Sequence, residues 1–226
     1  VTGVQTCALP ICLYSGYAQS KWVAEQVLEE AAARGLPVTL HRPSLIVGDS
    51  VQGRSHLADL VCRFLVGCVQ WGRWPEADIT LDLVPVDEVA QGVAASVLDP
   101  DDAGGANPAV RHWCALQPIR LDAIATLLTA ATGRSLQRQP LKQWLQGLRQ
   151  ALPPGNALHP VHPFLLQAQG PQGLTLLETL DGLDVQVLGH ARAGQTEGPL
   201  AHTQTTAVVR TMVRWLLATG QFDTPA

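Results

Sequence analysis

The sequence has little charge, few aromatic residues and no long apolar run. Of its 226 residues only 15% are charged and 5% aromatic, while 46% are hydrophobic, and the formal net charge is −4. The 15 Lys and Arg residues are scattered, so the basic patch that binds nucleic-acid phosphates is missing. No stretch reaches the roughly 18–20 apolar residues of a membrane span. Nucleic acid as a partner and a membrane span are therefore excluded, and the hydrophobic content argues against disorder.

Cysteine is scarce and unpaired in pattern. The five cysteines are Cys7, Cys12, Cys62, Cys68 and Cys114. They form no C-x-x-C pair and no close Cys/His grouping, which excludes a zinc finger and argues against a disulfide framework. The pattern predicts reduced thiols in a cytoplasmic protein, and we expect Cys62 and Cys68, which lie in an apolar helical pattern, to be buried as small hydrophobic residues.

The first twelve residues, VTGVQTCALPIC, fit neither a helix nor a strand. They also lack the basic start and the long apolar run of a signal peptide. The string resembles a translation of sequencing-adapter DNA. We therefore expect residues 1–12 to be a non-native leader outside any packed core, with the genuine protein beginning near Leu13.

Alternating helix and strand signals follow. Residues 19–33, QSKWVAEQVLEEAAA, are rich in strong helix formers and end before Gly35. The run LPVTLH, residues 36–41, is apolar and β-branched between two prolines, which predicts a buried parallel strand. Residues 42–53 are expected to be a loop. Helix, strand and loop in this order are half of a βαβ unit.

The pattern continues with a helix at 57–69, whose apolar residues recur at helical spacing. Residues 79–86, ITLDLVPV, predict a strand, and Asp87 is expected to be the N-cap of the helix that follows. After a turn-rich linker come a strand at 111–116, a helix at 120–133, and helical patterns at 141–152 and 205–220. These segments predict an α/β fold in which 13–103 are the C-terminal part of a Rossmann-like parallel sheet. Residues 104–226 are expected to form a mostly helical substrate subdomain.

Tyr17 and Lys21 are the strongest candidates for chemistry. They are four residues apart at the start of a helix, so they lie on one face about 6 Å apart along the axis. A phenol is a poor proton donor or acceptor near neutral pH, and a neighbouring ammonium favours its ionised form. A Y-x-x-x-K match alone is weak evidence, but here a buried strand and a Pro/Gly loop follow, as in sheets that bind ligands at strand carboxyl ends.

The blocks around this motif resemble a known family. GYAQSKWVAEQVL, RGLPVTLHRPSLIVGDS, GCVQWGRWPEA and LDLVPVDEVAQGV are similar to blocks of thioester reductase domains. These are extended short-chain dehydrogenases/reductases that end many nonribosomal peptide and polyketide synthases and carboxylic acid reductases. The resemblance is dense from Tyr14 to Leu98 and thin afterwards.

The resemblance implies roles for particular residues. Tyr17 would donate a proton to the substrate oxygen, and Lys21 would assist it and bind the nicotinamide ribose. Pro43, Ser44 and Ile46 would lie in the segment that passes under the nicotinamide of NADPH, although the same segment can be read equally as a simple strand-ending loop. The family's upstream Ser/Thr and its Gly-rich phosphate turn have no counterpart in this sequence.

The implied activity is NADPH-dependent reduction of an acyl thioester on a phosphopantetheinyl carrier protein to an aldehyde, with further reduction to an alcohol left open. One alternative is another extended reductase or epimerase acting on a small hydroxylated substrate. A second alternative is that these residues alone form an inactive fragment that binds no dinucleotide.

Other candidates are weaker. His159 and His162 lie in the proline-flanked run HPVHP without a nearby carboxylate or cysteine, which favours a surface turn over a metal site. Trp71 and Trp74 are candidates to line a substrate entrance.

Overall fold

A computed structural model describes residues 15–98, 107–183, 200–201 and 204–223. The expectation for residues 1–12 lies outside these ranges. The described chain combines parallel strands with helices, which confirms the predicted α/β class. The proposed division at residue 103 stays a prediction.

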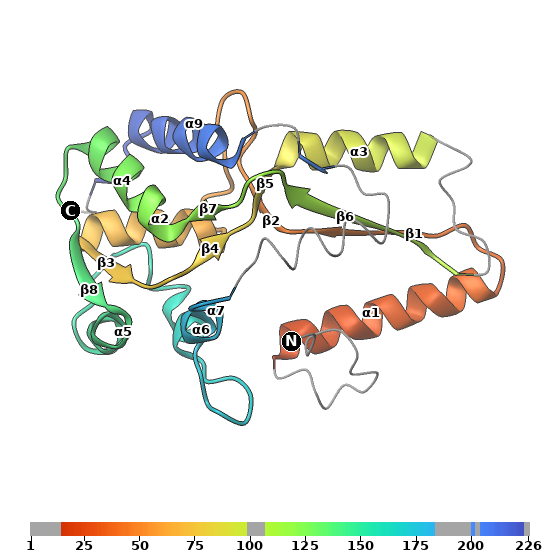
Figure 1. Ribbon diagram of the computed structural model, residues 1–226, viewed down its shortest axis with the longest axis horizontal. Coiled ribbons are helices and arrows are strands. Elements are labelled where there is room, and N and C mark those ends of the chain that lie inside the picture. The colour runs from red at the N-terminus through yellow and green to blue at the C-terminus, as the bar shows by residue number, and fades with distance from the viewer. Residues whose placement is uncertain (1–14, 99–106, 184–199, 202–203, 224–226) are drawn as a thin grey trace.

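One part of the fold is a layer of strands between two helices. Helix α1 (Gly16–Ala33) and helix α3 (Val86–Leu98) lie on opposite sides of strands β1 (Thr39–Pro43) and β6 (Ala109–Ala115) (Figure 1). Strands β1 and β6 are parallel over their paired length, and β9 (Leu200–Ala201) continues the sheet beside β6. This parallel layer fits the predicted Rossmann-like sheet, although β6 and β9 come from the segment after residue 103.

Helix α1 ends where its sequence predicts and begins one turn earlier. The side chain of Ser15 caps the first turn by accepting a hydrogen bond of 3.1 Å from the nitrogen of Ala18. At the other end Gly35 has a φ of +90°, a value that favours glycine and turns the chain toward β1. The predicted helix at 19–33 is therefore confirmed, with one further turn at its start.

The chain changes sheets at Ser44. Strand β1 pairs with β6 up to Pro43, whereas β2 (Leu45–Val47) pairs in parallel with β5 (Leu83–Pro85). The prediction of a loop through residues 42–53 was therefore wrong for β2. A strand of three residues is too short to show a period in the sequence. Strand β2 forms because β5 is available as its pairing partner.

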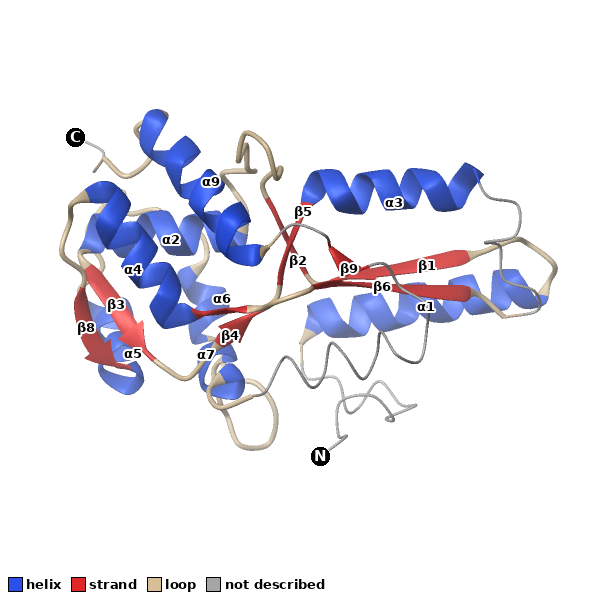
Figure 2. Ribbon diagram, turned by 45° about the horizontal axis from the view of Figure 1, so that its top comes forward, coloured by secondary structure: helices blue, strands red, loops and turns tan. Residues whose placement is uncertain are grey.

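A second, larger core lies beside this layer. It is built on helix α2 (Leu60–Trp71), where Cys62 and Cys68 are buried as predicted, with exposed fractions of 2% and 0%. The remaining elements are β3 (Arg73–Glu76), β4 (Thr80–Leu81), β7 (Ile119–Arg120), α4 (Leu121–Thr132), β8 (Gln137–Pro140), α5 (Leu141–Gln150), α6 (His162–Leu166), α7 (Leu176–Leu180) and α9 (Thr205–Ala218). Figure 2 shows these helices gathered at one end of the molecule.

An aromatic cluster fills the centre of this second core. The ring of Phe64 lies edge-on to Trp74, with centroids 5.4 Å apart, and 5.9 Å from the ring of Trp144. Both tryptophans have an exposed fraction of 0%. Trp74 therefore cannot line a substrate entrance, and Trp71, whose ring packs 5.8 Å from that of Trp144, belongs to the same cluster. The expectation was wrong for Trp74, because β3 carries it inward, and it stays a prediction for Trp71, which is half-buried.

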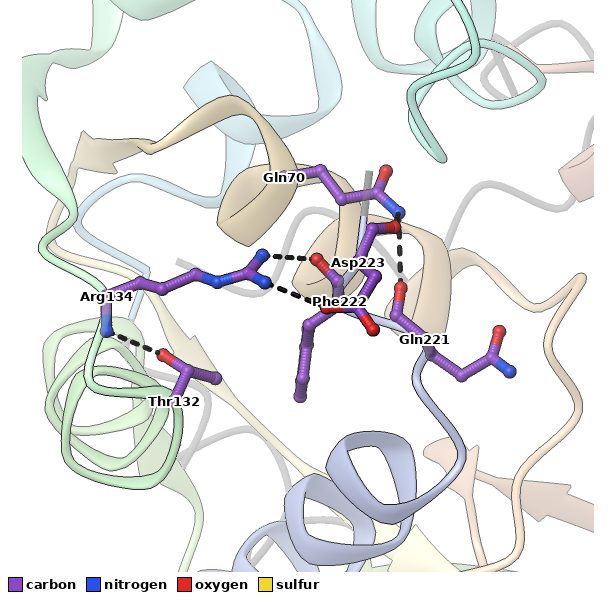
Figure 3. A network of polar contacts seen from close by, with 6 residues as sticks. All are labelled: Gln70, Thr132, Arg134, Gln221, Phe222 and Asp223. Atoms are coloured by element: carbon purple, nitrogen blue, oxygen red, sulfur yellow. Dashed lines mark hydrogen bonds and ion pairs between the residues drawn. The ribbon is translucent and has the colours of Figure 1, made fainter. Parts of the chain in front are cut away.

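The segment after α9 is tied to α2 and to the loop after α4. Arg134 donates to the carbonyl oxygen of Phe222 and pairs with Asp223 at 2.9 Å, while Gln70 donates to the carbonyl oxygen of Gln221 at 3.1 Å (Figure 3). Phe222 is buried. These contacts join residues far apart in the sequence around one core.

No helix in the described ranges has the length and apolar character needed to cross a membrane.

The rings of His159 and His162 bond to the backbone carbonyl oxygens of Pro153 and His159, at 2.8 and 2.6 Å. Within the part of the chain that the structure describes, no three His, Cys, Asp or Glu residues are grouped as metal ligands.

Candidate active site

Tyr17 and Lys21 lie together in the first turns of α1. The ammonium nitrogen of Lys21 is 5.5 Å from the centre of the Tyr17 ring, so the two side chains share a face as their spacing predicts. The Tyr17 side chain is open to solvent, with 70% of the residue exposed, and Lys21 is also exposed. Lys21 forms no ion pair with a described residue. A phenol and an ammonium are thus presented together on an open surface.

A bidentate ion pair fixes α1 against the strand that follows it. The guanidinium of Arg42 binds the carboxylate of Glu25 through two contacts, at 2.9 and 2.5 Å. Two parallel contacts of this kind set orientation as well as distance. The first turn of α1 and the carboxyl end of β1 lie at the same end of the layer (Figure 1), so this pair holds the helix that carries Tyr17. Sequence reasoning missed it because Glu25 and Arg42 are 17 residues apart.

Hydrogen bonds from Ser44 to Asp82 and Trp113 anchor the segment from Pro43 to Ile46. Ser44 donates its hydroxyl hydrogen to Asp82 at 2.7 Å, and its nitrogen donates to the carbonyl oxygen of Trp113 at 2.9 Å. The hydroxyl of Ser44 therefore already donates within the protein. Leu45 and Ile46 are the open part of the segment, with exposed fractions of 41% and 38%.

Asp82 is the residue that sequence reasoning missed here. It is buried, and its second carboxylate oxygen accepts a 2.6 Å hydrogen bond from the nitrogen of Ala115. Its own carbonyl oxygen accepts from the nitrogen of Leu45 at 3.2 Å. The carboxylate thus occupies the point where β2 and β5 diverge from β1 and β6. The available signal was an acidic residue inside the apolar run ITLDLVPV.

Asp87 does not cap the helix as predicted. Helix α3 begins at Val86, so Asp87 lies within its first turn. Its carboxylate instead accepts two hydrogen bonds from Ser50, from the nitrogen at 2.9 Å and from the hydroxyl at 2.6 Å. The prediction was wrong because the side chain has a partner in the loop after β2. Asp87 ties that loop to α3.

The loop after β2 is further ordered by Asp49. Its carboxylate accepts hydrogen bonds from the nitrogens of Val51, Gln52 and Arg54, at 3.1, 2.6 and 2.9 Å. These backbone donors, that of Gln52 foremost, hold the pKa of Asp49 below its ordinary value. Gly53 has a φ of +72°, and a Cβ there would come within 2.4 Å of the Thr211 carbonyl oxygen in α9. The loop is therefore rigid and packed against α9.

These residues are suited to the nicotinamide end of a dinucleotide. The exposed Tyr17 hydroxyl can meet a substrate oxygen, the Lys21 ammonium can meet a ribose hydroxyl, and the exposed side chain of Ile46 offers an apolar surface to a planar ring. Phosphate groups are commonly bound by a Gly-rich turn at a helix N-terminus, and this sequence has no such turn ahead of α1.

Comparison with known proteins shows what this chain is similar to. Residues 8–93 match the NAD-binding family model described as Male sterility protein. The L-2-aminoadipate reductase large subunit of Candida glabrata is 43% identical over 88 residues, which are 39% of this chain and 6% of that protein. Aldehyde reductase lnbA of Aspergillus flavus is 32% identical over 189 residues, which are 79% of this chain and 18% of that protein.

A solved structure extends the similarity over nearly the whole chain. The terminal R domain of the myxalamid PKS-NRPS biosynthetic pathway superposes with a TM-score of 0.72 at 31% identity, covering 96% of this chain and 53% of that domain. This chain thus spans about half of that solved domain and under a fifth of the two curated relatives.

Proposed function

The chain belongs to the extended short-chain dehydrogenases/reductases, in the group of the terminal reductase domains, and on that premise we propose that it contributes to NADPH-dependent reduction of a carrier-bound acyl thioester. The family and its relatives are NAD(P)H-dependent oxidoreductases. The proposed product is an aldehyde, released together with the thiol of the carrier's phosphopantetheine arm.

The Tyr17 phenol has the central part in this proposal. When bound, NADPH would supply the hydride that adds to the thioester carbonyl carbon. Tyr17 gives its proton to the carbonyl oxygen, so the product of addition is a neutral hemithioacetal. Breaking the carbon–sulfur bond then releases the aldehyde and the thiol. Two electrons and two hydrogens enter the substrate, and no other reductant is needed.

In this proposal Lys21 provides a positive charge beside Tyr17, and the Pro43–Ile46 segment helps to position the cofactor. The Lys21 ammonium lies beside the Tyr17 ring and places a positive charge next to the proton donor. It can also hold a ribose hydroxyl. Because the Ser44 hydroxyl donates to Asp82, we assign the cofactor contact of this segment to Pro43, Ile46 and the backbone.

The observation that carries the proposal is the pairing of Tyr17 and Lys21 on one exposed face of α1, at the carboxyl end of a parallel strand. Ligands of open α/β sheets bind at this end. A tyrosine buried in a core or turned from the lysine would have no such use.

The test is turnover in the natural protein that contains these residues. The acyl thioester is supplied on a phosphopantetheinylated carrier protein, NADPH oxidation is followed by absorbance, and the aldehyde is trapped as an oxime. Lys21→Ala should raise the KM for NADPH about 10-fold or more, in line with the loss of a charged hydrogen bond. Lys142→Ala, which removes an exposed lysine from α5, is the matched control. Oxidation of NADPH without aldehyde or alcohol would contradict the proposal.

A further inference from the structure

A cavity of about 260 Å³ opens beyond the carboxyl ends of β2 and β5, and the chemistry proposed above does not use it. Its lining includes the apolar side chains of Val47, Cys62 and Val86, which we call the apolar wall. It also includes the polar side chains of Arg54, His56 and Asp59, which we call the polar wall. Ile46 also lines the cavity, and this residue belongs to the segment assigned to the cofactor. The cavity therefore begins where the reacting end of a substrate is expected.

The polar wall stands on an ordered backbone. The nitrogen of Arg54 donates to Asp49 at 2.9 Å, and Asp87 fixes the same loop through Ser50. A loop held in this way loses little further backbone freedom when a ligand binds. The cavity wall thus has the preorganisation of a binding site.

The side chains of Arg54 and His56 lack partners within the described part of the chain. The Arg54 guanidinium forms no hydrogen bond or ion pair there, and neither does the ring of His56. By contrast, five other arginines form ion pairs, namely Arg34, Arg42, Arg120, Arg134 and Arg138.

The remaining polar groups of the wall are already engaged. Asp59 caps α2 by accepting from the nitrogen of Val61 at 2.9 Å, and Ser55 donates to the carbonyl oxygen of Gly53 at 3.0 Å. The Arg54 guanidinium therefore offers several open hydrogen-bond donors, which suit a ligand group rich in acceptors.

Size and polarity together define the ligand. Complete ligand pockets usually measure about 300–1,000 Å³, so this cavity holds part of a ligand, such as a short chain. Its apolar wall suits methylene groups. A planar guanidinium binds a carboxylate through two parallel hydrogen bonds. Asp59 adds a negative charge to the polar wall. The methylene chain of the ligand must therefore place the ligand's carboxylate next to Arg54 rather than next to Asp59.

We propose that this cavity is the acyl subsite and that Arg54 selects short acyl chains that end in a carboxylate. The inference rests on the proposed function, because it takes the reacting carbonyl to lie beside Ile46 and Tyr17. Arg54 is then a specificity-determining residue, and His56 is a second donor at the cavity mouth.

The experiment uses two isosteric thioesters of N-acetylcysteamine, one carrying a glutaryl group and the other its ω-amide. Binding to the natural protein is measured by calorimetry without NADPH, and kcat/KM is measured with NADPH. The acid should bind about 10-fold more tightly than the amide, as expected for one charge-assisted interaction at an exposed rim. Arg54→Ala should abolish this preference, and Arg54→Lys should restore part of it.

Arg34→Ala, which removes an arginine that follows α1 and does not line the cavity, should keep the preference. Equal affinity of the unaltered protein for acid and amide, or a preference that survives in Arg54→Ala, would overturn the inference. If Arg54→Ala does not fold, Arg54→Lys is the test. It lacks the planar guanidinium and must still weaken the preference for the acid over the amide. Selective binding without turnover would contradict only the proposed function, whereas turnover without selectivity would contradict only the role of Arg54.

Discussion

The hydroxyl of Ser44 donates to the carboxylate of Asp82 at 2.7 Å, at the point where the chain passes from one parallel pair of strands to the next. The same carboxylate accepts from the nitrogen of Ala115. One buried acidic residue thus joins β1, β5 and β6 beneath the segment assigned to the cofactor.

Replacing Asp82 should therefore destabilise the fold. Asp82→Ala removes two hydrogen bonds and leaves the nitrogen of Ala115 unsatisfied, so we expect the free energy of unfolding to fall by about 2–4 kcal/mol. Ser44→Ala should cost only about 1 kcal/mol, because it removes one bond. Urea denaturation measures both. The control is Asp122→Ala, which breaks an exposed pair with Arg138 and should cost at most about 1 kcal/mol. A loss in Asp82→Ala no larger than in this control would contradict the assigned role.

Gly92 should not tolerate a side chain. A Cβ at this position in α3 would lie 1.6 Å from the ring of Trp113 in β6. We expect Gly92→Ala to lower the free energy of unfolding by about 1–3 kcal/mol through overpacking. Gly16→Ala makes the same change in α1, where no atom lies within 4 Å of the added Cβ, and should be neutral or stabilising. Thermal denaturation of the two variants separates packing from helix propensity, and equal shifts would contradict the close contact.

The free energy of unfolding should fall at acidic pH because His41 becomes protonated. Burial, followed by the charge of Arg111, holds the pKa of His41 below its ordinary value of 6.5. Its ring accepts from Trp113 at 3.1 Å and lies 3.0 Å from the hydroxyl of Ser96. Because the folded state favours the neutral ring, this contribution is complete above pH 6.5 and is lost as the pH falls through the lower folded-state pKa.

Urea denaturation between neutral and mildly acidic pH tests this effect. His41→Gln should show a smaller loss of stability on acidification than the unaltered chain. His56→Gln, which alters an exposed imidazole, is the matched control. An unchanged dependence in His41→Gln would show that another group is responsible.

The 226-residue chain by itself should bind NADPH weakly or not at all. Most of the anchoring of a dinucleotide comes from backbone N–H groups at the pyrophosphate and from a residue on the adenosine ribose. The sequence contains no Gly-rich turn of this kind before α1. Tyr17, Lys21 and Ile46 can contact only the nicotinamide end. Calorimetric titration is the measurement, and a one-site isotherm in the low micromolar range would contradict this account of the binding energy.

Much of the fold was predictable because most helices are long enough to show a period. Helices α1, α2, α4, α5 and α9 overlap the segments in which helical patterns predicted them, and α2 is shifted toward the C-terminus. The strands of two to four residues were not predictable individually. They form because a partner strand is available, as when Leu45 pairs with Leu83, and such pairing leaves no local signal.

The candidate site was predictable only in its local part. The spacing of Tyr17 and Lys21 is a property of one helix, and the structure shows the expected shared face. The roles of Asp82 and Asp87 depend on partners 38 and 37 residues away, which no helical or strand period reports. The burial of Trp74 was not predictable, because it depends on contacts with Phe64 and Trp144, which belong to two other elements.

The central claim is that Tyr17 donates the proton in thioester reduction, and Tyr17→Phe in the natural protein tests it most directly. The variant keeps the ring beside Lys21 and removes only the hydroxyl. We predict that turnover of the carrier-bound thioester falls by about 10²–10⁴-fold, with the affinity for NADPH nearly unchanged. Tyr14→Phe, the same chemical change three residues earlier, is the control and should retain turnover. Unchanged turnover in Tyr17→Phe would remove Tyr17 from the mechanism and contradict the account.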